Sequence, residues 1–294
     1  MANNIFTFTS TLDYTEHLIV DLDGTLIRSD TLLEAYIKFI KLSFIKNLFL
    51  SMKWLLKGKK YFKEKLSKEV LIDPATLPYS EEVIDCVKEH KENKYKIILC
   101  SASHKKQVKL IADYLGIFDD HYGSSLDKNI KGKAKYEFID KELGIKNFSY
   151  IGNSKEDIFL WQKSKIIYFA NCNFLLKRRI RKDFSLCIDL TENESFYYQV
   201  KKFLKALRVY QWIKNFLVFV PMILASAFNV NNLYESFIAF ICISLSASAV
   251  YITNDIFDIE SDRYHPRKRF RPIANGEISI PVAGGSALLL FVVS

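Results

Sequence analysis

Four residues between positions 254 and 262 have the types and the spacing that suit divalent-metal chemistry. Asn254, Asp258 and Asp262 recur every four residues, and Asp255 lies just before Asp258 on the same stretch. A helix would therefore carry all four on one face. Converging hard oxygen ligands form a site for a cation such as Mg²⁺, which would offset the repulsion between the carboxylates. We predict that Asn254, Asp255, Asp258 and Asp262 are metal ligands.

A second pair of carboxylates follows an apolar run near the N-terminus. The segment HLIVDLD spans His17 to Asp23 and is followed by Gly24. As a buried parallel strand that feeds a loop, this segment would hold Asp21 and Asp23 at its carboxyl end. Open α/β sheets place their chemistry at that end. These two aspartates are therefore predicted site residues.

The elements that must position this pair are strands that alternate with helices. Further strand-like runs lie at Lys96–Cys100, Ser149–Ile151 and Lys165–Ala170. Amphipathic helical patterns lie between them, at Lys105–Tyr114, Lys135–Leu143 and Glu156–Lys163. This alternation predicts an α/β doubly wound parallel sheet.

The elements that must position residues 254–262 are apolar segments that could cross a membrane. Trp212–Phe228 and Phe237–Thr253 each hold about 17 mostly apolar residues, the lower limit for a span, and a third run begins near Ile280. Lysines and arginines precede the first run and follow the second, whereas the connector 229–233 has none. This charge pattern places the aspartates and the N-terminal part on the cytoplasmic side. We expect an all-α transmembrane bundle, incomplete in this chain, that passes several times through the cell inner (cytoplasmic) membrane.

The composition of the chain favours a membrane partner. The formal net charge is +9, and basic residues gather beside the apolar segments, at 177–182 and 201–208. Such juxtamembrane charge indicates an anionic lipid surface rather than nucleic acid. The five cysteines are scattered and odd in number, which indicates reduced thiols rather than disulfides or a cysteine metal site.

The N-terminal motifs resemble those of the haloacid dehalogenase-like superfamily in type and in order. DLDGTL at residues 21–26 is similar to the first motif of that family. Ser101 after KIILC is similar to the hydroxyl motif, and Lys131 in NIKGKAK is similar to the lysine motif. GNSKED, which contains Asp157, is similar to the acidic motif. Four motifs in order, over about residues 15–189, are a stronger signal than DxD alone.

The resemblance implies a sheet domain with a helical cap and a phosphatase that uses an aspartate nucleophile. Asp21 would attack phosphorus to form an aspartyl phosphate, and Asp23 would protonate the leaving oxygen. Ser101 and Lys131 would stabilise the charged phosphoryl group. Asp21 and Asp157 would hold Mg²⁺, which offsets the charge of the phosphate.

The acidic motif departs from the family pattern at one position. It usually begins Gly-Asp, whereas this chain has Gly152-Asn153. An amide offers a metal a carbonyl oxygen but no charge, so the metal affinity should be weaker. A domain that keeps the fold with little or no turnover is therefore the alternative to a working phosphatase.

A helical insert at about residues 29–92 separates the first two motifs, at the position of the family's cap. Its segment Phe39–Leu56 is a rich apolar helix with interspersed lysines. Two interpretations stay open. The segment would be a cap helix that packs on its neighbours, or an interfacial helix that inserts Phe, Leu and Trp side chains into a bilayer while its lysines reach the headgroups.

The C-terminal motif resembles that of the UbiA prenyltransferase superfamily. NDIFDIESD, residues 254–262, is similar to that family's first aspartate-rich motif, and a basic segment ending in RP follows it. The resemblance implies that the acids hold Mg²⁺ on a substrate diphosphate while Lys268 and Arg271 bind that diphosphate. Arg208, Lys214 and Asn215 are further candidate substrate ligands, although they would serve equally well as interface anchors. Their segment, LRVYQWIKNFLVF, resembles the polyprenyl-phosphate phosphoribosyltransferase branch.

These patterns divide the chain into three predicted parts. Residues 1–190 would form the haloacid dehalogenase-like domain, residues 191–211 a basic amphipathic linker, and residues 212–294 the N-terminal part of a UbiA-like transmembrane domain. The sequence is still apolar where it reaches Ser294, and the second aspartate-rich motif of the family is missing. We therefore expect a chain truncated at its C-terminus.

The predicted activity is that of a membrane-bound transferase with a fused phosphatase domain. It would use Mg²⁺-diphosphate chemistry on a polyprenyl lipid or polyprenyl phosphate and would transfer a phosphoribosyl or prenyl group. The phosphatase would then remove the 5-phosphate from a lipid-linked phosphoribose. Two alternatives stay open: a membrane-anchored phosphatase whose spans only tether it, and a non-catalytic scaffold that binds lipid.

Overall fold

The computed structural model describes residues 17–191 and 195–294. The chain divides into two compact units, each with a hydrophobic core of its own. One unit contains the segment that ends at Leu26 together with Ser80–Thr191. The other contains Ile27–Tyr79 together with the segment that follows Thr191. The helical insert is therefore shorter than the 29–92 expected, because α4 (Glu81–Glu92) belongs to the unit of the sheet.

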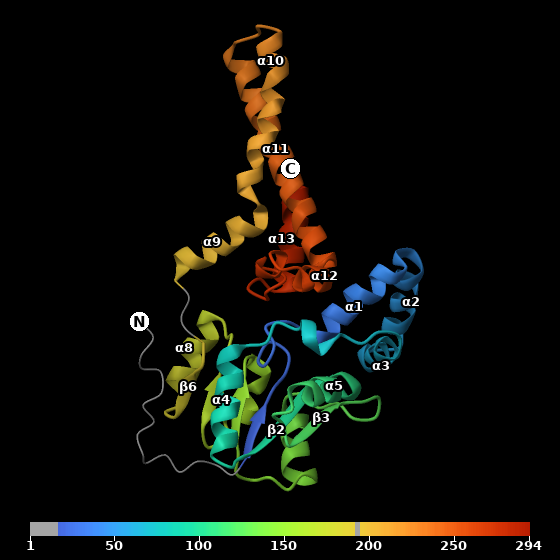
Figure 1. Ribbon diagram of the computed structural model, residues 1–294, viewed down its shortest axis with the longest axis vertical. Helices are drawn as coiled ribbons and strands as arrows, with labels where there is room; N and C mark the ends of the chain where they lie inside the picture. The colour runs from blue at the N-terminus through green and yellow to red at the C-terminus, as the bar shows by residue number, and fades with distance from the viewer. Residues whose placement is uncertain (1–16, 192–194) are drawn as a thin grey trace. The chain divides into compact units, whose positions relative to one another are not determined.

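The first unit is built on six parallel strands in the order β3-β2-β1-β4-β5-β6. In chain order they are β1 (His17–Val20), β2 (Lys96–His104), β3 (Asp120–Ser124), β4 (Ser149–Gly152), β5 (Ile167–Phe169) and β6 (Cys187–Asp189). Central β1 pairs with β2 and β4, so Val20 lies opposite Leu99 and Ile151 (Figure 1). The prediction of an α/β doubly wound parallel sheet is confirmed.

Short helices accompany the strands of this unit. They are α4, α5 (Lys105–Leu115), α6 (Lys133–Glu137), η2 (Phe138–Glu142), η3 (Lys155–Asp157), α7 (Ile158–Trp161) and α8 (Phe174–Asp183). Leu18, Ile19 and Val20 of β1 are fully buried, as an apolar central strand covered on both faces should be. The polar residues that follow such strands are therefore the ones left to form a site.

The second unit is helical, as predicted for the C-terminal part of the chain. The insert contributes α1 (Thr31–Leu42), α2 (Phe44–Leu56), α3 (Lys59–Glu69) and η1 (Pro74–Thr76). The C-terminal segment contributes α9 (Phe196–Leu207), η4 (Val209–Phe219), α10 (Val220–Leu224), α11 (Val230–Phe257), α12 (Ile259–Tyr264), η5 (Lys268–Phe270) and α13 (Ile280–Val293). Asn229 begins α11 as an N-cap, its side chain accepting a hydrogen bond from Asn232 N at 2.8 Å.

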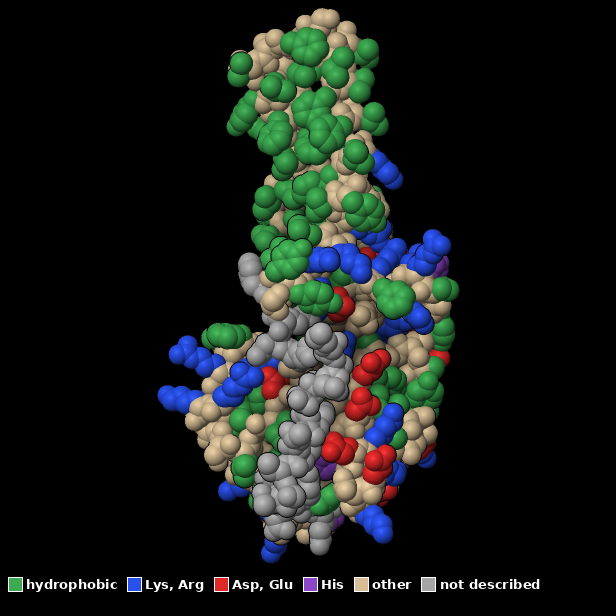
Figure 2. Space-filling model, turned by 60° about the vertical axis from the view of Figure 1, so that its left-hand side comes forward, with side chains coloured by type: hydrophobic (Ala, Val, Ile, Leu, Met, Phe, Trp, Pro, Cys, Tyr) green, Lys and Arg blue, Asp and Glu red, His purple; other side chains and the backbone are tan. Residues whose placement is uncertain are grey.

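One helix of the described chain, α11, is long and apolar enough to cross a membrane. It contains the predicted span Phe237–Thr253. The other two predicted spans correspond to shorter apolar helices, Val209–Leu224 and Ile280–Val293. In Figure 2, apolar side chains cover the part formed by α10 and α11, and Lys and Arg side chains gather where that part ends.

Small residues bring the neighbouring helices close to α11. Ser244, Ser248 and Ala249 are completely buried, which agrees with the close packing that small side chains permit between apolar helices. Two side chains of η4 donate hydrogen bonds to the buried serine hydroxyls of α11. Trp212 Nε1 donates to Ser248 Oγ at 3.0 Å, and Asn215 Nδ2 donates to Ser244 Oγ at 2.9 Å.

Candidate functional sites

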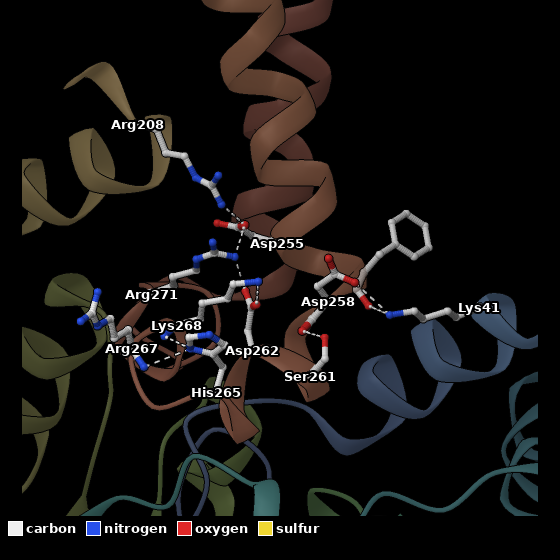
Figure 3. A network of polar contacts seen from close by, with 11 residues as sticks. Lys41, Arg208, Asp255, Asp258, Ser261, Asp262, His265, Arg267, Lys268 and Arg271 are labelled. Carbon is white, nitrogen blue, oxygen red and sulfur yellow. Dashed lines mark hydrogen bonds and ion pairs between the residues drawn. The ribbon is translucent and has the colours of Figure 1, made fainter. Parts of the chain in front are cut away.

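A buried cluster of carboxylates and guanidinium groups lies at the end of α11 (Figure 3). Asp255 and Asp262 are 3% and 1% exposed. Arg271 bridges them, because its Nη1 lies 3.0 Å from Asp255 Oδ1 and 2.6 Å from Asp262 Oδ2. Arg208 donates a second hydrogen bond to Asp255 Oδ1. Buried charges need such partners, because an unpaired carboxylate in this position would be costly.

Local backbone geometry brings the two arginines to this cluster from separate segments. Arg208 ends α9 in the left-handed region, with φ 52°, and its guanidinium lies 4.7 Å from the centre of the Tyr251 ring. Arg271 follows η5, where the backbone turns back so that Arg271 N donates to Lys268 O at 2.9 Å. Lys268 Nζ lies 3.8 Å from Asp262 Oδ1. The predicted diphosphate ligands Lys268 and Arg271 therefore both contact the aspartate-rich motif.

The other two members of the motif lie apart from this cluster. α11 ends at Phe257 and α12 begins at Ile259, so the helix is interrupted at Asp258. Asp258 Oδ1 accepts a hydrogen bond from Lys41 Nζ at 2.9 Å, and Figure 3 shows that contact on the far side of the helix from Arg271. Asn254 is exposed. The single helical face predicted for the four residues is thus split by the break at Asp258.

The oxygen ligands do not converge as a magnesium site requires. Among the described residues, no group of three or more His, Cys, Asp or Glu side chains is gathered around one point. Each aspartate of the motif instead contacts a cationic side chain. A cation held by both Asp255 and Asp262 would first have to displace Arg271, because the two groups would compete for the same oxygens. The oxygens that a metal would use thus contact cationic side chains in this structure, and Mg²⁺ at this motif stays a prediction.

The two candidate ligands on η4 do not join the cluster. Asn215 uses its amide on Ser244, and Lys214 is exposed. Asn215 is therefore a packing residue between η4 and α11, whereas the exposed position of Lys214 suits the alternative of an interface anchor. Of the candidate ligands near the start of η4, Arg208 is the one that contacts the cluster, through Asp255.

The second candidate site lies at the carboxyl end of β1 in the sheet unit. Lys135 Nζ lies 2.7 Å from Asp21 Oδ1, and both side chains are largely buried, at 3% and 13% exposure. Lys135 also donates to Tyr150 Oη at 2.9 Å, and Tyr150 Oη donates to Asp157 Oδ1 at 2.7 Å. A continuous chain of hydrogen bonds therefore joins Asp21 to Asp157.

The charges along this series of hydrogen bonds leave the Asp21 carboxylate available as a nucleophile. Burial raises the pKa of Asp21 to about 6, and the nearby positive charge of Lys135 opposes that rise. At neutral pH the carboxylate is mostly ionised, which a nucleophilic carboxylate requires. Burial and the neighbouring Asp157 raise the pKa of the Tyr150 hydroxyl well above its usual range. Tyr150 therefore stays a hydrogen-bond donor to Asp157.

The structure brings Lys135, rather than the predicted Lys131, to Asp21. Lys131 is exposed and forms an ion pair with Glu156 at 2.7 Å. Lys135 lies on α6 three and four residues before the buried Phe138 and Ile139. Residues with that spacing share one helix face, so the apolar residues that follow Lys135 were the signal that it points into the protein.

Ser103, which was not among the predicted site residues, links the predicted hydroxyl of Ser101 to Asp23. Ser101 is 1% exposed, and its Oγ accepts a hydrogen bond from Ser103 N at 3.0 Å. Ser103 Oγ donates to Asp23 Oδ2. The hydroxyl next to Asp23 is therefore that of Ser103, two residues after Ser101 along β2. Side chains two apart on a strand lie on the same face, which was the available signal.

Asp157 and Asn153 both contact backbone loops that follow the central strands. Asp157 Oδ2 accepts hydrogen bonds from Ser154 Oγ, from Ser154 N and from Asn153 N, at 2.9, 2.9 and 3.1 Å. With Tyr150 on its other oxygen, Asp157 is fully used in holding the loop after β4. Gly24 has φ 75°, and a Cβ there would lie only 2.0 Å from Asn153 Nδ2. The Asn153 amide thus packs against the loop that contains Asp23.

Comparison with known proteins identifies the C-terminal segment. Residues 215–294 match the UbiA prenyltransferase family. Decaprenyl-phosphate phosphoribosyltransferase of Corynebacterium glutamicum is 45% identical over 94 residues, which are 31% of this chain and 28% of that protein. Protein y4nM of Sinorhizobium fredii is 33% identical over 264 residues, which are 90% of this chain and 50% of that protein. The chain thus spans half or less of the length of these relatives.

Solved structures similar to this chain include a substrate-bound phosphoserine phosphatase, at 18% identity and a TM-score of 0.42. That similarity covers 65% of this chain and 98% of that chain. The score is too low to carry an argument, so the α/β fold of the first unit rests on its strand order. The C-terminal match is more specific, because it coincides with the helix that carries the aspartate-rich motif. Residues 215–294 of this chain are therefore similar in sequence to the UbiA prenyltransferase family.

Proposed function

We propose that the protein that contains this chain is a membrane-bound UbiA-type transferase with a fused phosphatase domain. The transferase would move a phosphoribosyl or prenyl group from a diphosphate donor, with a polyprenyl lipid or polyprenyl phosphate as its second substrate. The observation that carries the proposal is the cluster of Arg208, Arg271, Asp255 and Asp262 at the end of α11. The similarity to decaprenyl-phosphate phosphoribosyltransferases supports phosphoribosyl transfer to a lipid phosphate.

The chemistry of this cluster suits a diphosphate leaving group. A guanidinium group has several N–H donors in one plane, and Arg271 uses only one nitrogen on its two carboxylates. The remaining donors could bind a diphosphate oxygen, while Asp255 and Asp262 hold the planar group in a fixed orientation. Fixed donors stabilise the negative charge that grows on the leaving group as its bond to carbon breaks. Mg²⁺ stays a prediction for this reaction, because the oxygens described do not converge on a metal.

The phosphatase part of the proposal rests on the residues around Asp21. Asp21 would attack phosphorus while the bond from phosphorus to the leaving oxygen breaks, and Asp23 would give that oxygen its proton. Ser103 supports Asp23 through its hydroxyl. Lys135 would offset negative charge beside Asp21, the role predicted for Lys131.

The transferase proposal can be tested on membranes that contain the full-length protein. They would be incubated with phosphoribosyl diphosphate and polyprenyl phosphate, and the lipid product and released diphosphate would be measured. Arg271→Met should lower release strongly, and Arg269→Met is the matched control, because Arg269 lies over the Phe270 ring in the same loop. Equal loss in both variants, or no release by the unaltered protein, would overturn the assignment.

The same incubation tests whether the two activities act in sequence. Transfer of phosphoribose to a lipid phosphate leaves a 5-phosphate on the sugar, and a phosphatase with Asp21 as nucleophile would remove it. The unaltered protein should therefore yield a lipid-linked ribose together with inorganic phosphate. Asp21→Asn should stop at the lipid-linked phosphoribose. Retention of the 5-phosphate by the unaltered protein would contradict this order of reactions.

A second candidate function is a phosphatase whose apolar helices only tether it to a membrane. The buried contact between Lys135 and Asp21 favours it, since that contact exists within the sheet unit alone. This candidate predicts that Asp21→Asn removes all activity and that Asp258→Asn has no effect. The transferase proposal predicts that diphosphate release survives Asp21→Asn.

A further inference from the structure

The insert contains a helix whose apolar face is turned outward. On α2, the side chains of Ile45, Phe49 and Leu56 are 70%, 63% and 88% exposed. The exposed apolar residues of this helix are Phe44, Ile45, Leu48, Phe49, Met52, Leu55 and Leu56. At about 100° per residue they occupy one continuous side of the helix. A helix in water would direct this side into the protein core.

The inward face of α2 is made by polar side chains, which fixes the orientation of the helix. Asn47 and Ser51 are 6% and 1% exposed. Asn47 Nδ2 donates to Phe39 O at 2.6 Å, and Ser51 Oγ donates to Leu48 O at 2.8 Å. The Trp54 ring stacks on Phe39 with its centre 5.1 Å away. Rotating α2 to bury its apolar side would break the two contacts with Phe39 and would leave the Asn47 amide without that partner.

Positive charge borders the apolar side. Lys46 and Lys53 lie next to each other along the helix edge at a spacing of two turns. Both are exposed, and the sequence of α2 contains no acidic residue. Lys57 follows at the C-terminal end, and Lys59 and Lys60 begin α3. An apolar face with a lysine border is typical of a helix that lies in a membrane interface and contacts anionic headgroups.

Ion pairs within the second unit hold this insert beside the end of α11. Arg263 binds Glu34 through two hydrogen bonds of 2.7 and 2.8 Å, and both side chains are buried. Lys38 contacts Glu260 at 2.6 Å, and Lys41 contacts Asp258 at 2.9 Å. Because α2 begins two residues after α1 ends, these contacts place it at the aspartate-rich end of the helix that could cross a membrane (Figure 1).

We propose that α2 lies in the surface of the lipid bilayer, with its apolar side among the acyl chains and its lysines at anionic headgroups. The inference rests on the proposed membrane location of the transferase. It adds a second attachment, made by the insert and independent of the apolar helices of the C-terminal segment. Such a helix would hold the aspartate-rich end of α11 at a defined depth below the headgroups.

The test places a photoreactive side chain on α2 in the full-length protein. The protein would be reconstituted into vesicles of phosphatidylcholine and phosphatidylglycerol, with p-benzoylphenylalanine replacing Phe49. The same group at Phe237, 55% exposed on α11, reports the span, and at Glu69, exposed on α3, it reports a surface in water. Irradiation followed by mass spectrometry should detect lipid adducts at positions 49 and 237 and far fewer at 69.

The possible outcomes separate this inference from the proposed function. Lipid adducts at 237 together with a yield at 49 no higher than at 69, or crosslinking of 49 to a second protein copy, would overturn the interfacial helix alone. An absence of lipid adducts at both 49 and 237 would overturn the membrane location as well. The charge can be tested separately. Lys46→Glu with Lys53→Glu should lower the yield at 49 several-fold in vesicles with phosphatidylglycerol and should leave the yield at 237 unchanged.

Discussion

The two carboxylate sites of this chain handle buried charge in different ways. In the sheet unit, one lysine contacts one aspartate, with Lys135 Nζ 2.7 Å from Asp21 Oδ1. At the end of α11, one guanidinium group bridges two aspartates at 3.0 and 2.6 Å. An ammonium group is a compact point charge, whereas a guanidinium group is planar and can bind several oxygens in fixed directions. The first arrangement leaves a single carboxylate reactive, and the second fixes a cation that can bind an anion.

The scaffolds behind the two sites differ as well. Asp21 follows a strand paired on both sides, so its position is set by the register of β1 with β2 and β4. Asp255 and Asp262 are brought together by a helix break and by a loop that returns Arg271 to them. At the first site, a substitution of Asp21 or Lys135 removes one buried ion pair. The second should respond through both chemistry and folding, because its arginine also pairs buried carboxylates.

The largest effect is expected at the nucleophile of the sheet unit. Asp21→Asn should lower phosphatase turnover by at least ~10³-fold, because an amide cannot attack phosphorus to form the intermediate. Thermal stability of the variant should also fall, because the amide leaves the buried Lys135 ammonium group without its carboxylate partner. A steady-state assay with a phosphate monoester measures this loss. Turnover within tenfold of the unaltered protein would exclude Asp21 as nucleophile.

The next largest effect is expected at Arg271. Two substitutions there distinguish a guanidinium group that bridges two carboxylates from a simple positive charge. Arg271→Met should lower diphosphate release by about 10²-fold, the size expected for loss of one charge-stabilising donor. Arg271→Lys should recover only part of the rate, because one ammonium group cannot reproduce a planar bridge to both aspartates. Release assays on both variants in membranes measure the difference. Full recovery with lysine would show that charge alone suffices.

Substitutions of Lys135 and Lys131 test which lysine acts in the phosphatase. Lys135 contacts Asp21 in the structure, and Lys131 matches the lysine motif in the sequence. Lys135→Met should lower phosphatase turnover by about 10²-fold, because it removes the cation beside Asp21. Lys131→Met should change turnover less than about threefold, since an exposed ion pair contributes little. Both variants would be compared at saturating substrate, with circular dichroism as a check on folding. The opposite ranking would restore Lys131 as the functional lysine.

The pH dependence of the phosphatase should give the smallest of these effects. Burial raises the pKa of Asp21 to about 6, so the nucleophile becomes protonated as the pH falls through that value. Below it, kcat/KM should fall about tenfold per pH unit. Lys135 lowers the pKa of Asp21, so the residual activity of Lys135→Met should decline at a higher pH. A decline only near pH 4 would contradict the effect of burial.

Much of the sheet unit could be predicted from local sequence, whereas the ion pairs could not. Apolar runs identified β1, β2, β4 and β5, but β3 reads DHYGS and carries no such signal, because it is a half-exposed strand at the sheet edge. Asp21 and Asp23 were found because both directly follow a buried strand. Lys135 was missed because the match of Lys131 to a motif ignored which face of α6 is buried.

The ion pairs of the aspartate-rich segment could not be predicted from local sequence either. Helical spacing predicted one face for four residues, yet the helix is interrupted at Asp258. The partner of Asp258 is Lys41, which is 217 positions away in the chain. Local periodicity carries no information about a contact of that length, so neither the split of the motif nor the place of the insert could be predicted from it.

The sequence by itself determined where most of the strands, the long apolar helix and the carboxylates lie along the chain. These depend on short-range patterns of apolar, polar and turn residues. Only the tertiary structure decided which cation meets which carboxylate and which side of α2 faces outward. Those choices depend on long-range contacts, because a buried charge is stable only beside a partner that folding brings to it. In the structure, Arg271 contacts two aspartates of this motif and Lys41 contacts a third, which are partners that local spacing could not identify.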